Sequence, residues 1–94
     1  MYARVARFEG AEPGALKRIA EELNSGPREP PPGVPAVGFL MLSGEEGSSV
    51  SITLFETEDD LRTGNEALGE MSPSADGGHR VSLDTYEVGV DIRL

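Results

Sequence analysis

The sequence has no cysteine, no tryptophan and only one histidine, His79. The absence of cysteine excludes structural disulfides and thiolate metal sites as supplements to the hydrophobic core. A single histidine among scattered carboxylates has no recognisable metal-ligand spacing, so we predict that the protein binds no metal ion. With 94 residues, the chain has the length of one domain, residues 1–94, and buries only about 60 to 65 % of its unfolded surface. Part of its stability is therefore expected to come from a partner surface.

Basic side chains are also scarce, since eight Lys and Arg stand against seventeen Asp and Glu, for a net charge of −9. Because such a surface repels a phosphate backbone, we predict no nucleic-acid partner. No apolar run approaches the roughly 18 residues of a membrane span. The chain begins at once with a strand-like segment in place of a secretory leader. We therefore expect no membrane association and a cytoplasmic location.

The segment of residues 50–71 gives the clearest structural signal. It begins with alternating apolar and polar residues, which indicates a strand with one face more buried than the other. Thr57 then supplies a helix N-cap, and the acidic residues 58–60 complement the positive end of the helix dipole. The sequence thus predicts a strand that leads directly into a helix. Its apolar residues are Val50, Ile52 and Leu54 in the strand and Leu61, Gly64, Leu68 and Met71 along one helical stripe.

A strand, a helix and a stiff connector precede this segment. Residues 2–8 carry apolar groups on both faces of a predicted strand, with Arg4 on the same face as Tyr2. Pro13 suits the first turn of a helix whose apolar residues recur at i, i+3, i+4 and i+7. Residues 27–35 contain five prolines, which hold the connector extended.

Two further strands complete the pattern. Residues 36–43 are apolar at nearly every position, which predicts a strand covered on both faces, and the GEEG turn at 44–47 joins it to the next strand as a hairpin. Residues 80–94 are predicted to form one long last strand. Its apolar parity changes near Asp84 and Thr85, which one extra residue in a β-bulge would explain. The loop before it is marked by residues 72–78.

The resulting order is strand, helix, strand, strand, helix, strand. Two helices of about 13 residues cover one face of a four-stranded sheet, yet the strands at 36–43 and 80–94 carry apolar side chains on both faces. A second copy of the same sheet can cover the remaining face, because a two-fold axis makes one apolar patch self-complementary. We therefore predict a homodimer formed through the sheet faces.

This pattern resembles the dimeric α/β barrel superfamily, in particular proteins similar to antibiotic biosynthesis monooxygenases. The resemblance spans the chain and rests on the hairpin after a proline-rich connector, the strand-to-helix run LFETEDDLR and the terminal run TYEVGVDIRL. It implies an α+β fold, with a ferredoxin-like βαββαβ subunit, a four-stranded antiparallel sheet and a dimeric α/β barrel. It also implies a pocket between helices and sheet. Members include cofactor-free oxygenases, haem-degrading enzymes and proteins without known activity.

Four side chains are candidate ligand contacts. Asn65 lies on the flank of the second helix's apolar stripe and points either into a pocket or to water. Arg4 is turned inward and needs an anionic partner, and an Asp or Glu of the protein is favoured over a ligand carboxylate. Tyr86 is either a donor to a ligand or a core residue with its hydroxyl at the rim. His79 is either a general base or a solvated loop residue.

The resemblance leaves two functional hypotheses. Cofactor-free oxygenation of a phenolic or polyketide-like compound needs polar anchors and a base, and the missing tryptophan and the lack of an acid–base pair count against it. The haem-degrading members carry a histidine on the second helix, which this helix lacks, so we predict no cofactor. We favour a homodimer that binds a small apolar or aromatic molecule or has no catalytic activity. The oxygenase-like enzyme is the alternative.

Overall fold

The structure, a computed structural model, describes residues 1–70 and 77–94. Its elements follow the predicted order, strand, helix, strand, strand, helix, strand, which confirms the ferredoxin-like βαββαβ arrangement. Predictions that fall on Met71 and on residues 72–76 lie outside the described residues. The elements are β1 (Tyr2–Glu9), α1 (Ala15–Ser25), β2 (Gly38–Ser43), β3 (Ser49–Phe55), α2 (Glu58–Gly69) and β4 (His79–Glu87).

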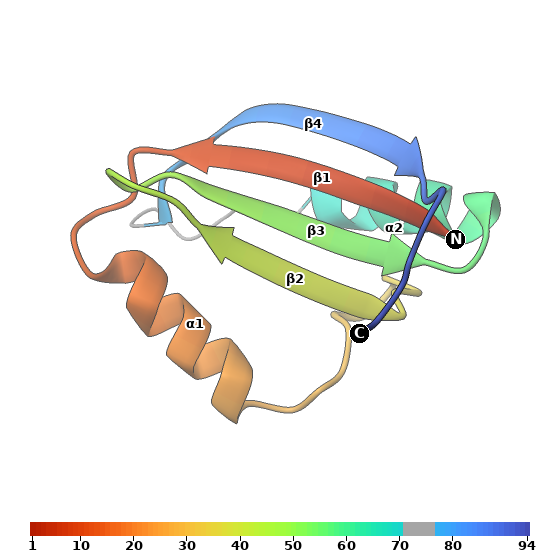
Figure 1. Ribbon diagram of the computed structural model, residues 1–94, viewed down its shortest axis with the longest axis horizontal. Helices are drawn as coiled ribbons and strands as arrows, with labels where there is room; N and C mark the ends of the chain where they lie inside the picture. The colour runs from red at the N-terminus through yellow and green to blue at the C-terminus, as the bar shows by residue number, and fades with distance from the viewer. Residues whose placement is uncertain (71–76) are drawn as a thin grey trace.

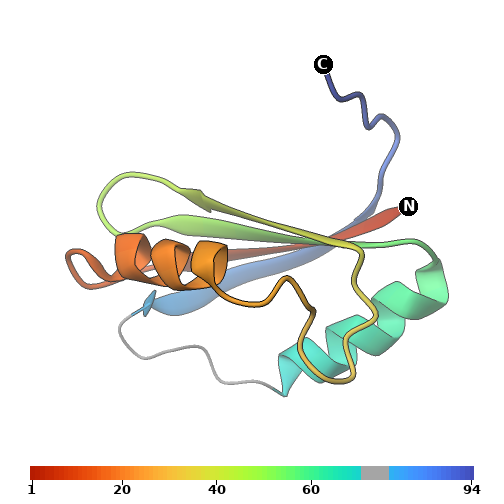
Figure 2. The ribbon, with the colours of Figure 1, turned by 90° about the horizontal axis from the view of Figure 1, so that it is seen from below.

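The four strands form one antiparallel sheet in the order β2-β3-β1-β4 (Figure 1). α2 lies on one side of this sheet and residues 88–94 leave it on the other side (Figure 2), whereas α1 lies beside the β2 edge (Figure 1). α2 packs against the central strands β1 and β3. Neither helix of the described chain is both long and apolar enough to cross a membrane.

α2 begins where the sequence predicts. The side chain of Thr57 accepts a hydrogen bond from the Asp60 amide at 3.1 Å, which satisfies one of the free N–H groups of the first turn. Leu61 and Gly64 are the buried residues of this helix. A side chain at Gly64 would occupy the space of the Phe55 ring, so glycine is required for β3 and α2 to approach this closely.

The core consists of Phe55, Leu61 and Val34. Phe55 is the largest fully buried side chain. Val34 belongs to the proline-rich connector. The connector therefore contributes one residue to the core in addition to joining α1 to β2. By contrast, α1 buries only Ala15, and Leu23 near its C-terminal end is 53 % exposed. The first helix therefore covers less of the sheet than its apolar spacing predicts.

The sheet has two faces that we name for what covers them. The helix face is the side toward α2, and it includes Arg4, which bonds to Asn65, and Phe55, which packs against Gly64. The alternation of side chains and the strand register assign the other residues. The helix face also carries Tyr2, Ala6, Phe39, Met41, Thr53, Leu83 and Thr85. The open face carries Ala3, Val5, Arg7, Leu40, Leu42, Val50, Ile52, Leu54, Asp84 and Tyr86.

The strand at 36–43 is not covered on both faces within one subunit. Phe39 on the helix face is 52 % exposed, and Leu40 and Leu42 on the open face are 46 % and 50 % exposed. The β2–β3 hairpin itself is as predicted, with Glu46 and Gly47 in the left-handed region and the Gly44 amide bonded to the Ser48 carbonyl at 2.9 Å. The apolar side chains of β2 are therefore left about half exposed on both faces of the sheet.

Two predictions for the last strand are wrong. Strand pairing stops at Glu87, and residues 88–94 form no strand, although the Val88 amide still donates to the Met1 carbonyl at 2.8 Å. The register irregularity lies between the Arg7–Ser82 and Phe8–Arg80 pairs, so Val81 is the extra residue and the bulge is not near Asp84. Leu83 and Tyr86 lie on opposite faces by ordinary alternation, which explains the change of parity.

Candidate functional site

The structure brings two of the predicted site residues together on the helix face. The Arg4 Nε donates a hydrogen bond to Oδ1 of Asn65 at 2.9 Å, which joins β1 to α2 across 61 residues of sequence. Arg4 is only 7 % exposed, and Asn65 is half-buried. The amide therefore fixes the orientation of a buried guanidinium, because the N–H groups of arginine lie in one plane.

Arg4 has no carboxylate partner among the described residues. Ion pairs there include those of Arg62 with Glu58 and Asp59 and that of Arg93 with Asp91. The prediction that an Asp or Glu of the protein pairs with Arg4 is thus wrong for the described part of the chain. An amide is a neutral acceptor, so it satisfies one N–H group without neutralising the charge.

The electrostatic environment of Arg4 disfavours its charge. Burial lowers the pKa of Arg4 below its usual value, and the nearby Arg80 guanidinium lowers it further. Arg80 pairs with Phe8 in the register, which places it on the same side of the sheet. Two cations therefore share this part of the helix face.

Arg4 belongs to a row of residues that runs across three strands. Phe39 pairs with Thr53, and Thr53 pairs with Arg4, so all three side chains are on the helix face. Adjacent strands lie about 4.8 Å apart, which separates Phe39 from Arg4 by about 10 Å at the backbone. The row presents an exposed aromatic ring at one end and a buried cation at the other.

The other two predicted site residues lie elsewhere. Tyr86 pairs with Ala3 on the open face and is 55 % exposed, so the sheet separates it from Arg4. His79 is exposed at the start of β4, opposite Glu9, with its ring beside Gly10. The four residues do not form one pocket.

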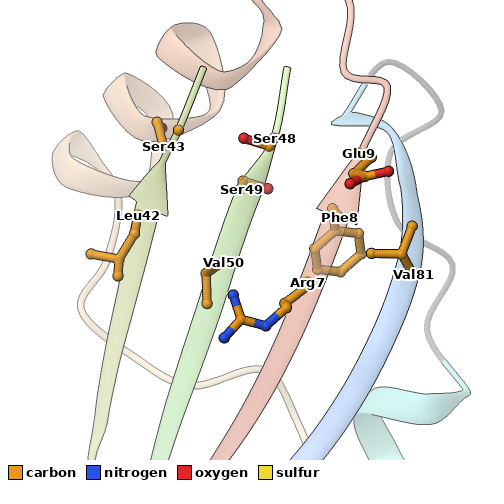
Figure 3. A pocket seen from close by; sticks show the side chains of 10 residues that line it. Arg7, Phe8, Glu9, Leu42, Ser43, Ser48, Ser49, Val50 and Val81 are labelled. Atoms are coloured by element: carbon orange, nitrogen blue, oxygen red, sulfur yellow. The ribbon is translucent and has the colours of Figure 1, made fainter. Parts of the chain in front are cut away.

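Two hollows occur elsewhere on the molecule. One, of about 250 Å³, lies on the open face near the β2–β3 turn and is lined among others by Arg7, Leu42 and Val50 (Figure 3). The other, of about 500 Å³, lies between the start of α1 and the β2–β3 turn. Neither is lined by Arg4 or Asn65. Residues 1–70 and 77–94 contain no group of three or more His, Cys, Asp or Glu placed to hold a metal ion.

Sequence reasoning did not single out Phe39 or Thr53. The sequence offered only the alternation of residues along the strand. Because nearly every residue near Phe39 is apolar, this alternation does not show which face Phe39 occupies. Only the register with β3 shows that Phe39, rather than Leu40, shares the face of Arg4.

Comparison with known proteins finds similarity in structure but none in sequence. No protein-family model matches the chain. No curated protein sequence is similar to it. Among solved structures, the haem degrader MhuD from Mycobacterium tuberculosis, with two haems bound in its active site, is similar at a TM-score of 0.66 and 17 % identity, covering 99 % of this chain and 100 % of that chain.

A variant of MhuD with two manganese protoporphyrin IX molecules per active site is similar at a TM-score of 0.64 and 17 % identity, covering 99 % of each chain. Identity this low establishes the fold alone. The predicted resemblance is supported at that level, since the chain shares the βαββαβ fold of these structures over nearly its whole length.

Proposed function

We propose that the protein is a homodimer of single-domain subunits that binds a small, largely apolar or aromatic molecule on the helix face of each sheet. The observation that carries the proposal is the row Phe39–Thr53–Arg4, which combines an aromatic ring 52 % exposed with a buried cation held by Asn65. Ligand sites are mostly apolar surfaces with a few placed polar groups, and this row has that composition.

The incomplete cover of the helix face supports this proposal. α2 packs on β1 and β3, whereas α1 lies beside the β2 edge and buries only Ala15 (Figure 1). Phe39 is therefore left accessible on the side of the sheet toward α2. A flat molecule lying on Phe39 would remove apolar surface from water, at about 25 cal/mol for each Å² buried.

Haem is not the ligand that these residues fit. MhuD is described with haem in its active site, but α2 of this chain contains no histidine, cysteine, methionine or tyrosine that could ligate iron. The single histidine, His79, is exposed at the start of β4, where it pairs with Glu9. We therefore propose a ligand without a coordinated metal.

Binding is better supported than catalysis. The oxygenase-like alternative needs Arg4, Asn65 and Tyr86 around one enclosed substrate, and Tyr86 is on the open face. No acid–base pair adjoins Arg4 among the described residues. The only hydrogen bond that the Arg4 side chain forms with them goes to the Asn65 amide. Oxygen uptake with hydroquinones or anthrones above background would revive the alternative.

The binding proposal is tested with N-phenyl-1-naphthylamine, a neutral aromatic dye whose fluorescence rises in apolar surroundings. We expect saturable binding by the native protein and about tenfold weaker binding by Phe39→Ala, because the ring supplies most of the apolar contact. Leu40→Ala is the matched control, since Leu40 is adjacent, similarly exposed and on the opposite face. The absence of saturable binding, or equal effects of both variants, would contradict the proposal.

The open face supports the homodimer. Most of its residues are apolar, with Leu40, Leu42 and Tyr86 about half exposed, and exposed patches of this kind commonly mark contact surfaces. Residues 88–94 leave the sheet on this same side (Figure 2) and expose Val90 and Ile92. A second copy would cover both features with the same residues through a two-fold axis.

Sedimentation velocity at micromolar concentration tests the dimer. We expect the native chain to sediment as a dimer and Leu42→Glu as a monomer, because a charge would be buried in an apolar contact. Leu23→Glu is the control, since Leu23 is similarly exposed but belongs to α1. A monomeric native protein would refute the dimer.

A further inference from the structure

The buried guanidinium of Arg4 is incompletely partnered. One of its five N–H donors, on Nε, is used by Asn65 at 2.9 Å. No carboxylate of the described residues forms an ion pair with it, although the chain carries seventeen acidic side chains. A buried charge without a counter-ion is costly, so proteins rarely keep one unless something else supplies the opposite charge.

A second cation increases this imbalance. Arg80 acts on Arg4 through its charge and is on the same side of the sheet. Folding could relieve the repulsion by placing one of the abundant acids here, yet among the described residues none pairs with either side chain. The positive charge at this place thus contrasts with a protein that is otherwise strongly acidic.

The geometry of Arg4 defines which anion fits. Because Nε is engaged by Asn65, the two terminal nitrogens form the edge of the guanidinium that is left for a ligand. This edge carries parallel N–H groups that match the two oxygens of a planar carboxylate. Asn65 acts as a positioning residue, since it fixes the plane in which those N–H groups lie.

The length of the row defines the rest of the ligand. Phe39 and Arg4 lie two strands apart, about 10 Å at the backbone, with the small, buried Thr53 between them. A molecule that contacts both ends therefore combines a flat apolar body of one or two rings with an acid group at one end.

We infer that the molecule bound on the helix face is an aromatic carboxylate, whose anion pairs with the terminal nitrogens of Arg4 and whose rings extend toward the exposed ring of Phe39. This inference rests on the proposed function and narrows it from apolar or aromatic compounds to aromatic acids. The protein as a whole repels anions through its net charge of −9. Selective binding of an acid therefore requires a local cation, and Arg4 supplies it.

The test is displacement of N-phenyl-1-naphthylamine by 2-naphthoate and by 2-naphthamide, which have the same rings but differ in charge. We expect the acid to displace the dye at about tenfold lower concentration than the amide. Arg4→Met should remove this preference, and Arg4→Lys should retain only part of it, because lysine keeps the charge but loses the planar edge. Arg62→Met is the control, as it removes an exposed cation from α2.

A spectroscopic measurement separates direct contact from a structural effect. Nitrogen-15 NMR of the native protein should show the Arg4 side-chain resonances shifting on addition of 2-naphthoate but not of 2-naphthamide. Asn65→Ala should weaken binding of the acid while leaving that of the amide unchanged. Circular dichroism and dye binding confirm that each variant is folded.

The outcomes distinguish this inference from the proposed function. Equal displacement by acid and amide, unchanged in Arg4→Met, would overturn the aromatic carboxylate and leave an uncharged ligand in place. A native protein that binds neither the dye nor the naphthalenes would overturn both. Preference for the acid that persists in Arg4→Met but is lost in Arg62→Met would place the anion on the surface and overturn the role of Arg4.

Discussion

The two faces of the sheet use their side chains in different ways. The helix face mixes apolar and polar residues, and one of them, Phe55, is completely buried against Gly64 of α2, while a polar pair links Arg4 to the same helix. The open face is apolar over β2 and β3, yet Leu40 and Leu42 there remain about half exposed. The difference shows that burial within the subunit follows the position of α2 and not the hydrophobicity of a strand.

The largest expected effect separates Phe55 from its neighbour Leu54. Phe55→Ala should destabilise the protein by about 3 to 5 kcal/mol, because it removes the central core ring and leaves a cavity. Leu54→Ala, one residue away on the open face, should cost less than half of that in the monomer, since Leu54 is only half-buried. Urea denaturation measures the free energy of unfolding of both variants, at protein concentrations too low for the proposed dimer to form. Similar costs would mean that the two faces contribute equally within a subunit.

A smaller effect tests how closely α2 approaches the helix face. Gly64→Ala should destabilise by about 1 to 3 kcal/mol, because the new methyl group meets the Phe55 ring. Gly69→Ala, in the same helix, has open space around it and should stabilise by about 0.5 to 1 kcal/mol. Thermal denaturation followed by circular dichroism compares them. Stabilisation by both variants would show that the helix and the sheet are not in tight contact at Gly64.

The smallest effect concerns the polar pair. Arg4→Met should stabilise by about 1 kcal/mol, because it removes a buried cation that lacks a counter-ion, and it leaves the half-buried Asn65 within reach of water. The lowered pKa of Arg4 means that its charged form is penalised in the fold at every pH below that pKa. The gain should therefore stay constant from about pH 6 to about pH 9, where the guanidinium remains charged. Denaturant titrations across this pH range measure the gain. A loss of stability in Arg4→Met would contradict the prediction.

The sequence was informative where a local rule governs the structure. The Thr57 cap and the change from strand to helix period both follow from neighbouring residues, and both are confirmed. The inward placement of Arg4 could also be predicted from strand alternation, whereas the sequence left Asn65 between a pocket and water. Their hydrogen bond could not, because it joins residues 61 positions apart and depends on how α2 docks.

The errors in the last strand have a physical cause as well. Apolar residues on both parities fit either a slipped register or a strand with two apolar faces, and the sequence does not distinguish these. The structure shows the second case, with Leu83 and Tyr86 on opposite faces and the bulge earlier, at Val81. The residues after Glu87 have apolar side chains but no neighbouring strand in the subunit, so their composition alone could not show where pairing ends.

The hydrogen bond from Val88 to Met1 brings the first residue of the chain to the base of the C-terminal segment. A bulky tag at either terminus would thus emerge beside the open face, where it would obstruct the proposed dimer contact. The β2–β3 turn is at the opposite end of the sheet, since Ser43 pairs with Ser49 there while Tyr2 pairs with Phe55. An affinity or fluorescent label for studies of assembly is best inserted between the exposed residues Glu45 and Glu46.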